Sequence, residues 1–548
     1  MSADERGYPD FQDHLKALHD KGLLRTIDVP INKDTEMHPL VRWQFRGGVP
    51  ESQRSAFLFT NIKDSKNKTY DMPVVVGALA ATPEIYSIGM GVPVDEIGDK
   101  WTHAIANPID PVEVEEGACQ EVVITGDDLI GPGNGLETLP VPISSPGFDA
   151  APYFTATGVI TKDPETGVQN MGTYRGGLKA PNRLGVRMSS RPGGAEGYLH
   201  WLKYQKRGDK TMDCVFVIGA QPPICFMGPQ KMPIGVDEMT VAGALLGAPV
   251  RMVKGKTVDL MIPADAELII EGKVDTELLE PEGPFGESHG HIALEDFNMS
   301  MTVTAITHKS NAIMPSIISQ VTPSESSVIK RVAYEPMYLN HLRNNLSLKC
   351  VKKVSLHEPL TNIRKVLFVQ LEKGTSRTEV WRALNGASML RADSGKYVIA
   401  IDQDIDPDNA DSVFWALAYR ANPIEDMQIL PHRARGHGPK AKDGPSEDST
   451  LLIDATMKGD MPPLALPKKE YMEHAKEIWE RLQLPSLTPQ SPWHGYEMGH
   501  WSDDWEDGAV RAVQGFYHVN GENTYARRRG GLKPETPVWE VPEEDSED

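Results

Sequence analysis

The spacing of apolar side chains predicts that the chain begins with mixed α and β structure. Three apolar residues share one face of a predicted helix over residues 11–21, and Gly22 follows as a stop signal. These residues are Phe11, Leu15 and Leu18. The segment 73–77, Pro-Val-Val-Val-Gly, is typical of a short buried strand ended by a turn. We therefore predict a first, α/β domain at residues 1–115.

The middle of the chain is dominated by short runs of β-branched or alternating residues. Turns rich in glycine and proline separate these runs, which is the pattern of an all-β barrel or sandwich. The runs are 121–125, 153–161, 214–218, 266–270 and 301–307. We predict a strand-rich central domain at residues 116–320.

After residue 320 strand and helix patterns alternate, which favours an α/β domain at residues 321–485. The predicted strands are 365–371 and 397–401, and the predicted helices are 378–384 and 411–420. Residues 468–482 form an amphipathic pattern, so this helix packs either on its own chain or on another subunit. The remainder, 486–548, shows little periodicity and ends in an acidic tail that we expect to be solvated.

Composition excludes several classes of protein. The chain has 548 residues, enough for about three domains. Its net charge of −21 argues against a nucleic-acid partner, which would need a basic surface. No apolar run reaches the roughly 18–20 residues that span a bilayer, and the N-terminus has no signal-peptide core. Four dispersed cysteines without metal-type spacing indicate reduced thiols in the cytoplasm.

The segment Glu282-Gly-Pro-Phe-Gly-Glu287 carries the strongest chemical signal. Pro284 and its flanking glycines exclude a regular helix, so the segment can turn two carboxylates into one cavity. Carboxylates that share a site tend to split their pKa values, which suits proton transfer. A loop with two solvated glutamates is the alternative for this segment taken alone.

A second motif, Asn170-Met-Gly-Thr-Tyr-Arg175, lies upstream. An asparagine amide oxygen can bind a hard cation, and an arginine five residues later can hold a carboxylate with two hydrogen bonds. Turn chemistry alone also explains the asparagine and the glycines, so this motif is ambiguous when it is read by itself.

The two motifs in this order resemble the UbiD family of prenylated-FMN-dependent reversible decarboxylases. Further segments match the family in sequence order over about residues 10–480. They are Leu199-His200-Trp201, Val236-Asp-Glu238 with 241–249, the strand segment 257–272, and the C-terminal blocks 401–406 and 452–458. The spacing between Asn170 and His200 is longer here than in some relatives.

The resemblance implies the fold and the ligands. It implies an N-terminal α/β domain, a central split β-barrel like that of flavin reductases, and a C-terminal α/β domain. It also implies prenylated FMN, a divalent metal such as Mn²⁺, and K⁺. By the same resemblance, the metal ligands are Asn170, His200 and Glu238, and the cofactor contacts are these three with Met171, Thr173 and Arg175.

The resemblance also implies the activity. Arg175, Glu282 and Glu287 would form the catalytic network, with Glu282 ionised by Arg175 and Glu287 delivering the proton where CO₂ leaves. The expected substrate is an aromatic or heteroaromatic acid, with an aryl-CoA acid such as phthaloyl-CoA as an alternative. The expected partners are a flavin prenyltransferase that supplies the cofactor and further copies of the chain in a homodimer or homohexamer.

Other interpretations remain open at this point. A flavin-binding oxidoreductase without decarboxylation would keep the same scaffold, and a non-catalytic carboxylase subunit would bind no cofactor. His289 and His291 alternate after the acid segment, so they could form a metal pair in a hydrolase. His432 and His437 are candidates for contact with the substrate.

Overall fold

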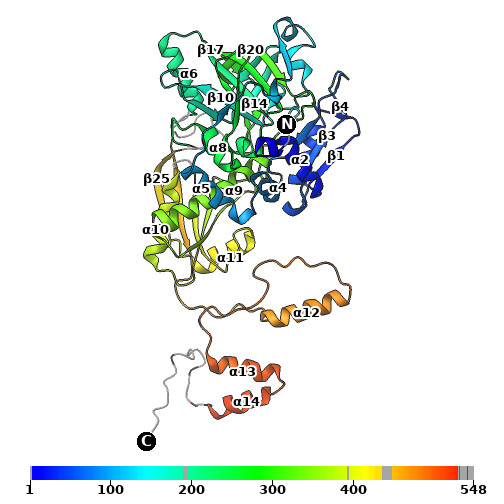
Figure 1. The fold of residues 1–548 in the computed structure, drawn as a ribbon. Coiled ribbons are helices and arrows are strands. Elements are labelled where there is room, and N and C mark those ends of the chain that lie inside the picture. Colours follow the sequence, from blue (N-terminus) through cyan, green and yellow to red (C-terminus); the bar gives the residue numbers. More distant parts are fainter. Residues whose placement is uncertain are drawn as a thin grey trace. The chain divides into compact units, whose positions relative to one another are not determined.

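The computed structural model describes residues 3–188, 195–230, 232–391, 394–434 and 447–528, together with residues 438, 530, 533 and 540. The chain divides into two compact units (Figure 1). The first unit contains Met1–Gln403 and Asn422–Asp454, and the second contains Asp404–Ala421 and Ala455–Asp548.

The first unit begins with helices packed around a small sheet. Helix α2 (Phe11–Asp20) starts at Asp10, whose side chain accepts the Asp13 N–H in a capping box, and it buries the predicted apolar face. The four-stranded sheet has the order β1-β3-β6-β21, so a strand from residues beyond 310 completes it. Its strands are β1 (Leu24–Ile27), β3 (Ala56–Phe59), β6 (Val74–Val76) and β21 (Met314–Ser316). The neighbouring helices are α3 (Met37–Arg46), α4 (Pro83–Met90) and α5 (Ile97–Ala106).

A nine-stranded sheet forms the centre of the first unit. Its path runs β11-β10-β14-β17-β20-β13-β12-β9, and β8 pairs with β20 beside this path. The strands are β8 (Val122–Thr125), β9 (Tyr153–Phe154), β10 (Thr157–Lys162), β11 (Gln169–Gly172), β12 (Gly176–Ala180), β13 (Arg183–Val186), β14 (Thr211–Ile218), β17 (Leu268–Glu282) and β20 (Asp296–His308). Within the described ranges no pairing joins the ends β11 and β9, so the split β-barrel stays a prediction while the mixed α/β architecture is confirmed.

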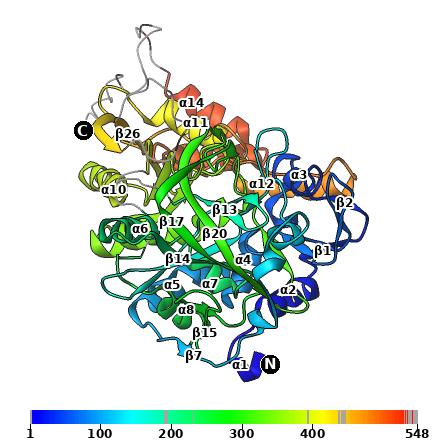
Figure 2. The same cartoon turned by 90° about the horizontal axis from the view of Figure 1, so that it is seen from above.

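The long antiparallel pair of β17 and β20 positions the acid segment. Figure 2 shows these two strands beside β14 across the middle of the unit. Glu282 is the last residue of β17 and lies opposite Asp296 at the start of β20. The acid segment is therefore the connection at the tip of this strand pair. Three helices lie earlier in the chain, before β17: α6 (Glu196–Arg207), α7 (Pro222–Met227) and α8 (Glu238–Leu246).

The first unit also contains a five-stranded C-terminal sheet. Its order is β22-β23-β24-β26-β25, and β23 and β24 pair in parallel with α10 (Arg377–Leu390) between them in the chain. The strands are β22 (Val351–Leu356), β23 (Val366–Leu371), β24 (Tyr397–Asp402), β25 (Met427–Ala434) and β26 (Glu447–Ala455). Helix α9 (Glu325–Asn340) precedes this sheet and packs on β22.

The second unit is mostly helical. It contains α11 (Ala410–Arg420), α12 (Lys469–Arg481), α13 (Asp503–Val513) and α14 (Tyr517–Ala526). None of the side chains of α12, α13 and α14 is buried, although α12 forms where its amphipathic pattern predicts a helix. Near the start of the unit, Arg420 binds Asp404 with two hydrogen bonds of 2.9 and 2.7 Å.

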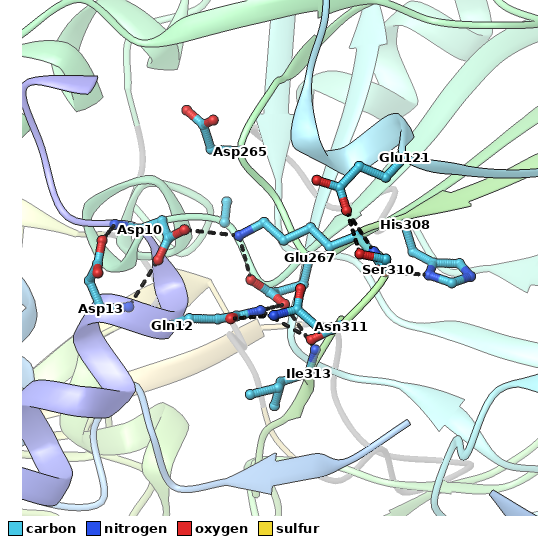
Figure 3. A network of polar contacts seen from close by, with 12 residues as sticks. Asp10, Gln12, Asp13, Glu121, Asp265, Glu267, His308, Ser310, Asn311 and Ile313 are labelled. Carbon is cyan, nitrogen blue, oxygen red and sulfur yellow. Dashed lines mark hydrogen bonds and ion pairs between the residues drawn. The ribbon is translucent and has the colours of Figure 1, made fainter. Parts of the chain in front are cut away.

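A buried polar network ties α2 to the end of β20 inside the first unit (Figure 3). Lys309 donates to Asp10 at 3.0 Å and to Glu267 at 2.8 Å. Glu267 also accepts the side-chain amide of Gln12 at 2.8 Å. Since Glu267 is fully buried, its charge needs these donors, and the network fixes the N-terminal helix to the central sheet.

Most predicted elements form, but their lengths differ. The predicted strand 153–161 splits into β9 and β10, and at the break the Thr155 hydroxyl accepts the Ile317 N–H at 2.9 Å. The predicted strand 266–270 extends to Glu282 as β17, because β20 supplies partners for residues that lack an apolar pattern. In the part of the chain that the structure describes, no helix is long and apolar enough to cross a membrane.

Candidate active site

The structure brings the predicted arginine and both predicted acids together. Arg175 donates from Nε and Nη2 to the two oxygens of Glu282, at 2.8 and 2.9 Å, and from Nη1 to Glu287. Planar double hydrogen bonding of this kind is the strongest geometry between arginine and a carboxylate. One guanidinium therefore bridges the two ends of the acid segment.

Three separate segments of the chain supply these side chains. Arg175 lies in the turn between β11 and β12, Glu282 ends β17, and Glu287 follows the short strand β18 (Phe285–Gly286). On β20, the neighbouring strand, Asn298 donates to Glu282 at 2.9 Å. No sequence spacing indicates the Asn298 contact, because it arises from the pairing of two long strands.

Aromatic rings enclose the arginine. The guanidinium carbon of Arg175 lies 4.5 Å from the ring centroid of Phe285, within the range of a cation–π contact. The rings of Phe285 and Tyr153 are 4.2 Å apart at their centroids. Burial raises the pKa of the Tyr153 hydroxyl, and the negative charge of Glu282 raises it further.

The electrostatics of this site keep the arginine charged. Burial alone would lower the pKa of Arg175, but the hydrogen bonds and charges of Glu282 and Glu287 raise it well above its usual value. A second guanidinium, that of Arg187, lies 3.4 Å from Glu282 at a partly exposed position. The carboxylates of the acid segment are thus paired with two guanidinium groups of the same chain.

A second cluster contains the three predicted metal ligands. Asn170 on β11 donates from Nδ2 to Glu238 Oε1 at 2.8 Å, and the Met171 N–H donates to Glu238 Oε2 at 2.8 Å. His200 on α6 contacts the Thr161 hydroxyl through Nδ1 at 2.9 Å. The structure thus places Asn170 directly against Glu238 and buries all three predicted ligands.

Glu196 joins this cluster, although the sequence reading missed it. It lies one helical turn before His200 on α6, with 3.8 Å between Glu196 Oε1 and His200 Nε2. Glu196 Oε2 lies 3.5 Å from Asn170 Nδ2, and the Gly235 N–H donates to Glu196 Oε1 at 3.0 Å. The i, i+4 spacing from a candidate metal-binding histidine is the signal that could have identified it.

The charges of the second cluster have no cationic partner among the contacts described above. Burial raises the pKa of Glu238 to about 8, and the nearby charge of Glu196 adds to the effect. Burial lowers the pKa of His200 to about 4, so this imidazole is neutral at neutral pH. Asn170 Oδ1 is buried without a hydrogen-bond partner. A neutral imidazole, a carboxylate and a free amide oxygen are donors that fit a divalent cation.

The remaining predicted contacts lie next to this cluster. The Thr173 N–H donates to the Gly228 carbonyl at 3.2 Å. A Cβ atom at Gly228 would lie 2.3 Å from Thr173 Oγ1, so the backbone approaches closely only because residue 228 is glycine. Met171 thus lies on β11 beside Asn170, and Thr173 directly follows the end of that strand.

The histidines outside the two clusters do not form a metal site in the described part of the chain. No group of three or more His, Cys, Asp or Glu side chains there is arranged to hold a metal, and the second cluster reaches three candidate ligands only with the amide of Asn170. The rings of His289 and His291 lie 5.8 Å apart. His432 is exposed and contacts Glu447 at 2.7 Å, whereas His437 lies outside the described residues.

Comparison with protein families identifies the fold that carries these clusters. Three models of one family match the chain in order: the N-terminal domain of 3-octaprenyl-4-hydroxybenzoate carboxy-lyase at residues 15–105, its Rift-related domain at 111–321, and its C-terminal domain at 327–455. The chain belongs to the UbiD family of carboxy-lyases.

Individual relatives agree with this assignment. The chain is 29% identical to an uncharacterised protein of Aquifex aeolicus over 513 residues, which cover 87% of this chain and 99% of that protein. The solved UbiD-class enzyme HmfF from Pelotomaculum thermopropionicum, in complex with FMN, is 28% identical, with a TM-score of 0.74 over 85% of this chain and 100% of that one. The apo 3,4-dihydroxybenzoic acid decarboxylase AroY of Klebsiella pneumoniae shares the fold, at 21% identity and a TM-score of 0.71 over 86% and 99% of the two chains.

Proposed function

We propose that this protein catalyses the non-oxidative, reversible decarboxylation of an aromatic or heteroaromatic carboxylic acid, with prenylated FMN as its cofactor. The observation that carries the proposal is the bridge from Arg175 to the buried Glu282 and the partly buried Glu287. The FMN complex of the related HmfF and the prenylated-FMN complex of its evolved dimeric form support the choice of cofactor.

The proton chemistry follows from the acid cluster. Loss of CO₂ from an aromatic carbon leaves an electron pair that no side chain can accept, and bound prenylated FMN supplies the electron sink. Arg175 orients the substrate carboxylate and pairs with Glu282. Glu287 donates a proton to the carbon that CO₂ leaves, and in the reverse direction it removes that proton.

The second cluster would hold the cofactor by its phosphate end. Asn170, His200 and Glu238 would bind a divalent metal such as Mn²⁺, and Glu196 would support the set from the first turn of α6. A divalent cation there would satisfy the free amide oxygen of Asn170 and the buried charge of Glu238. K⁺ is part of the proposal only through the family resemblance.

The proposal includes the organisation of the chain and its assembly. We assign the domains to residues 1–115, 116–320 and 321–485, with an extension at 486–548, and the family matches support this order. The dimeric form of HmfF and the exposed amphipathic helix α12 support a homo-oligomer. Mass photometry of the purified chain tests the oligomeric state.

Cofactor loading and turnover together test the function. The protein should be co-expressed with a flavin prenyltransferase, and its ultraviolet–visible spectrum and the mass of the extracted cofactor recorded. We expect a modified flavin, and CO₂ release from at least one member of a panel of aromatic acids, heteroaromatic acids and aryl-CoA acids. A fully loaded protein that releases no CO₂ from the panel and instead oxidises NAD(P)H would contradict the proposal.

A further inference from the structure

The loop that presents Glu287 has very little secondary structure of its own. Strand β18 pairs with β19 (Ile292–Ala293) over only two residues on each side. The Glu287 N–H donates to the His291 carbonyl at 3.0 Å, which closes the turn but does not attach it to the rest of the sheet. An isolated two-stranded hairpin is only marginally stable even when it is longer, so a further contact is needed to fix the position of Glu287.

Asp149 provides a contact of this kind. Its Oδ1 accepts the N–H of Gly286, the residue before Glu287, at 2.9 Å. Its Oδ2 accepts the N–H of Ser145 at 2.6 Å. Hydrogen bonds to a carboxylate are stronger than those between neutral groups, so this side chain joins the acid loop to the segment 144–150.

The backbone of the two segments is also in direct contact. The Ala150 N–H donates to the Pro284 carbonyl at 3.1 Å. A Cβ atom at Gly283 would lie 2.4 Å from the Cβ of Ala150, and one at Gly286 would lie 2.6 Å from Ser145 Oγ. Both glycines of the acid segment therefore allow the segment 144–150 to lie against it.

The surroundings of Asp149 raise the pKa of its carboxyl group on balance. Burial is the largest cause, and the N–H groups of Gly286 and Ser145 and the charge of Arg175 offset it only in part. On another side, Arg42 on α3 donates to Gln320 Oε1 at 2.8 Å, and the side chain of Gln320 packs against Gly286. The acid segment is thus held between Asp149 and Gln320, and Arg42 of the N-terminal domain fixes the side chain of Gln320.

We propose that Asp149 is a positioning residue for the decarboxylation: it holds the Gly286 N–H, and through it keeps the Glu287 carboxylate against Arg175 and directed at the reacting carbon. This inference rests on the proposed function. The alternative role for Asp149 is only to close its own turn, through the Ser145 N–H.

Hydrogen–deuterium exchange on the apo protein separates the two roles without any turnover. Asp149→Ala removes both acceptors, whereas Asp149→Asn keeps the size but replaces one acceptor with a donor. We expect exchange in the peptide 283–293 to rise at least about tenfold in Asp149→Ala, the factor expected for losing a charge-assisted hydrogen bond, and less in Asp149→Asn. Asp128→Ala, at an exposed aspartate of the same domain, should leave that peptide unchanged.

Turnover of the loaded enzyme gives the second readout. Asp149→Ala should lower kcat about tenfold or more with little change in KM, and Asp149→Asn should recover part of the loss. The inference is overturned if exchange in 283–293 is unchanged in both variants, if exchange rises equally across β17 and β20, or if kcat stays at the wild-type value. If the wild type itself releases no CO₂, the exchange result still decides whether Asp149 holds the loop.

Discussion

Two carboxylate clusters lie in the central domain, and they differ in where the balancing positive charge comes from. In the acid cluster, Arg175 neutralises Glu282 and Glu287 directly. The second cluster, Asn170, Glu196, His200 and Glu238, is named the metal cluster after its proposed ligand. There Glu238 faces an asparagine and a second glutamate, and its pKa rises to about 8.

The comparison shows which site is complete in the chain and which site needs a ligand. Buried polar groups in proteins are normally satisfied, so the unpartnered Asn170 Oδ1 marks the incomplete site. Under the proposed function, the arginine-paired site would position a substrate and transfer a proton. The roles of holding a cofactor and moving a proton would then fall to two clusters joined by the strand and turn from Asn170 to Arg175.

The largest effect should come from removing the cation of the acid cluster. Arg175→Met leaves Glu282 and Glu287 without their guanidinium, and loss of one partner from a buried ion pair costs about 3–5 kcal/mol. Urea denaturation should show this drop in the free energy of unfolding. The amount of metal bound per folded chain should not change. A loss of bound metal in this variant would contradict the claim that the two clusters act independently.

The complementary change removes the anionic ligand of the metal cluster. Glu238→Gln should weaken Mn²⁺ binding by at least about 10–100-fold, because even outer-shell partners of metals contribute that much. Metal analysis after dialysis measures the loss, with Glu165→Gln, an exposed glutamate, as the control. Stability in the absence of metal should fall by little, since the neutral form of residue 238 is already favoured at pH 7.

The pH dependence of metal binding distinguishes the clusters further. With a pKa of about 8, Glu238 is mostly protonated at pH 6, so a metal ion must displace a proton in order to bind. Mn²⁺ affinity should therefore rise by up to about tenfold per pH unit between pH 6 and 8 and level off above pH 8. Calorimetry in two buffers would detect the released proton. A flat profile in the wild type would contradict the assignment of Glu238.

The smallest effect is expected at the edge of the acid cluster. Arg187 lies 3.4 Å from Glu282 and keeps 22% of its side chain exposed. Arg187→Ala should change the free energy of unfolding by less than about 1 kcal/mol, as is usual for a partly exposed ion pair. A loss as large as that for Arg175→Met would show that both arginines, rather than one, neutralise the acid segment.

The sequence predicts the candidate catalytic motifs better than it predicts the residues that hold those motifs in position. Asn170, Arg175, Glu282 and Glu287 stand in segments where glycine and proline restrict the backbone, so their local patterns are distinctive. Asn298 and Asp149 act through contacts that form only when distant strands and loops meet. Their neighbours in sequence carry no pattern that indicates a site.

The same reason explains the differences in the fold. The end of β17 carries charged residues such as Glu280 and Glu282, and only the pairing with β20 makes this stretch a strand. The extension also contains α13, which begins at a Ser502 cap and is absent from the elements predicted from the sequence.

The most direct test of the division of roles is the rate of CO₂ release per bound flavin in Glu287→Gln, compared with the wild type. The variant should bind metal and flavin as the wild type does, because Glu287 lies in the acid cluster. Its rate should fall by about 10²–10⁴-fold, the usual contribution of a positioned general acid. A rate within a few-fold of the wild type, or a loss of bound flavin that accounts for the whole decrease, would contradict the account.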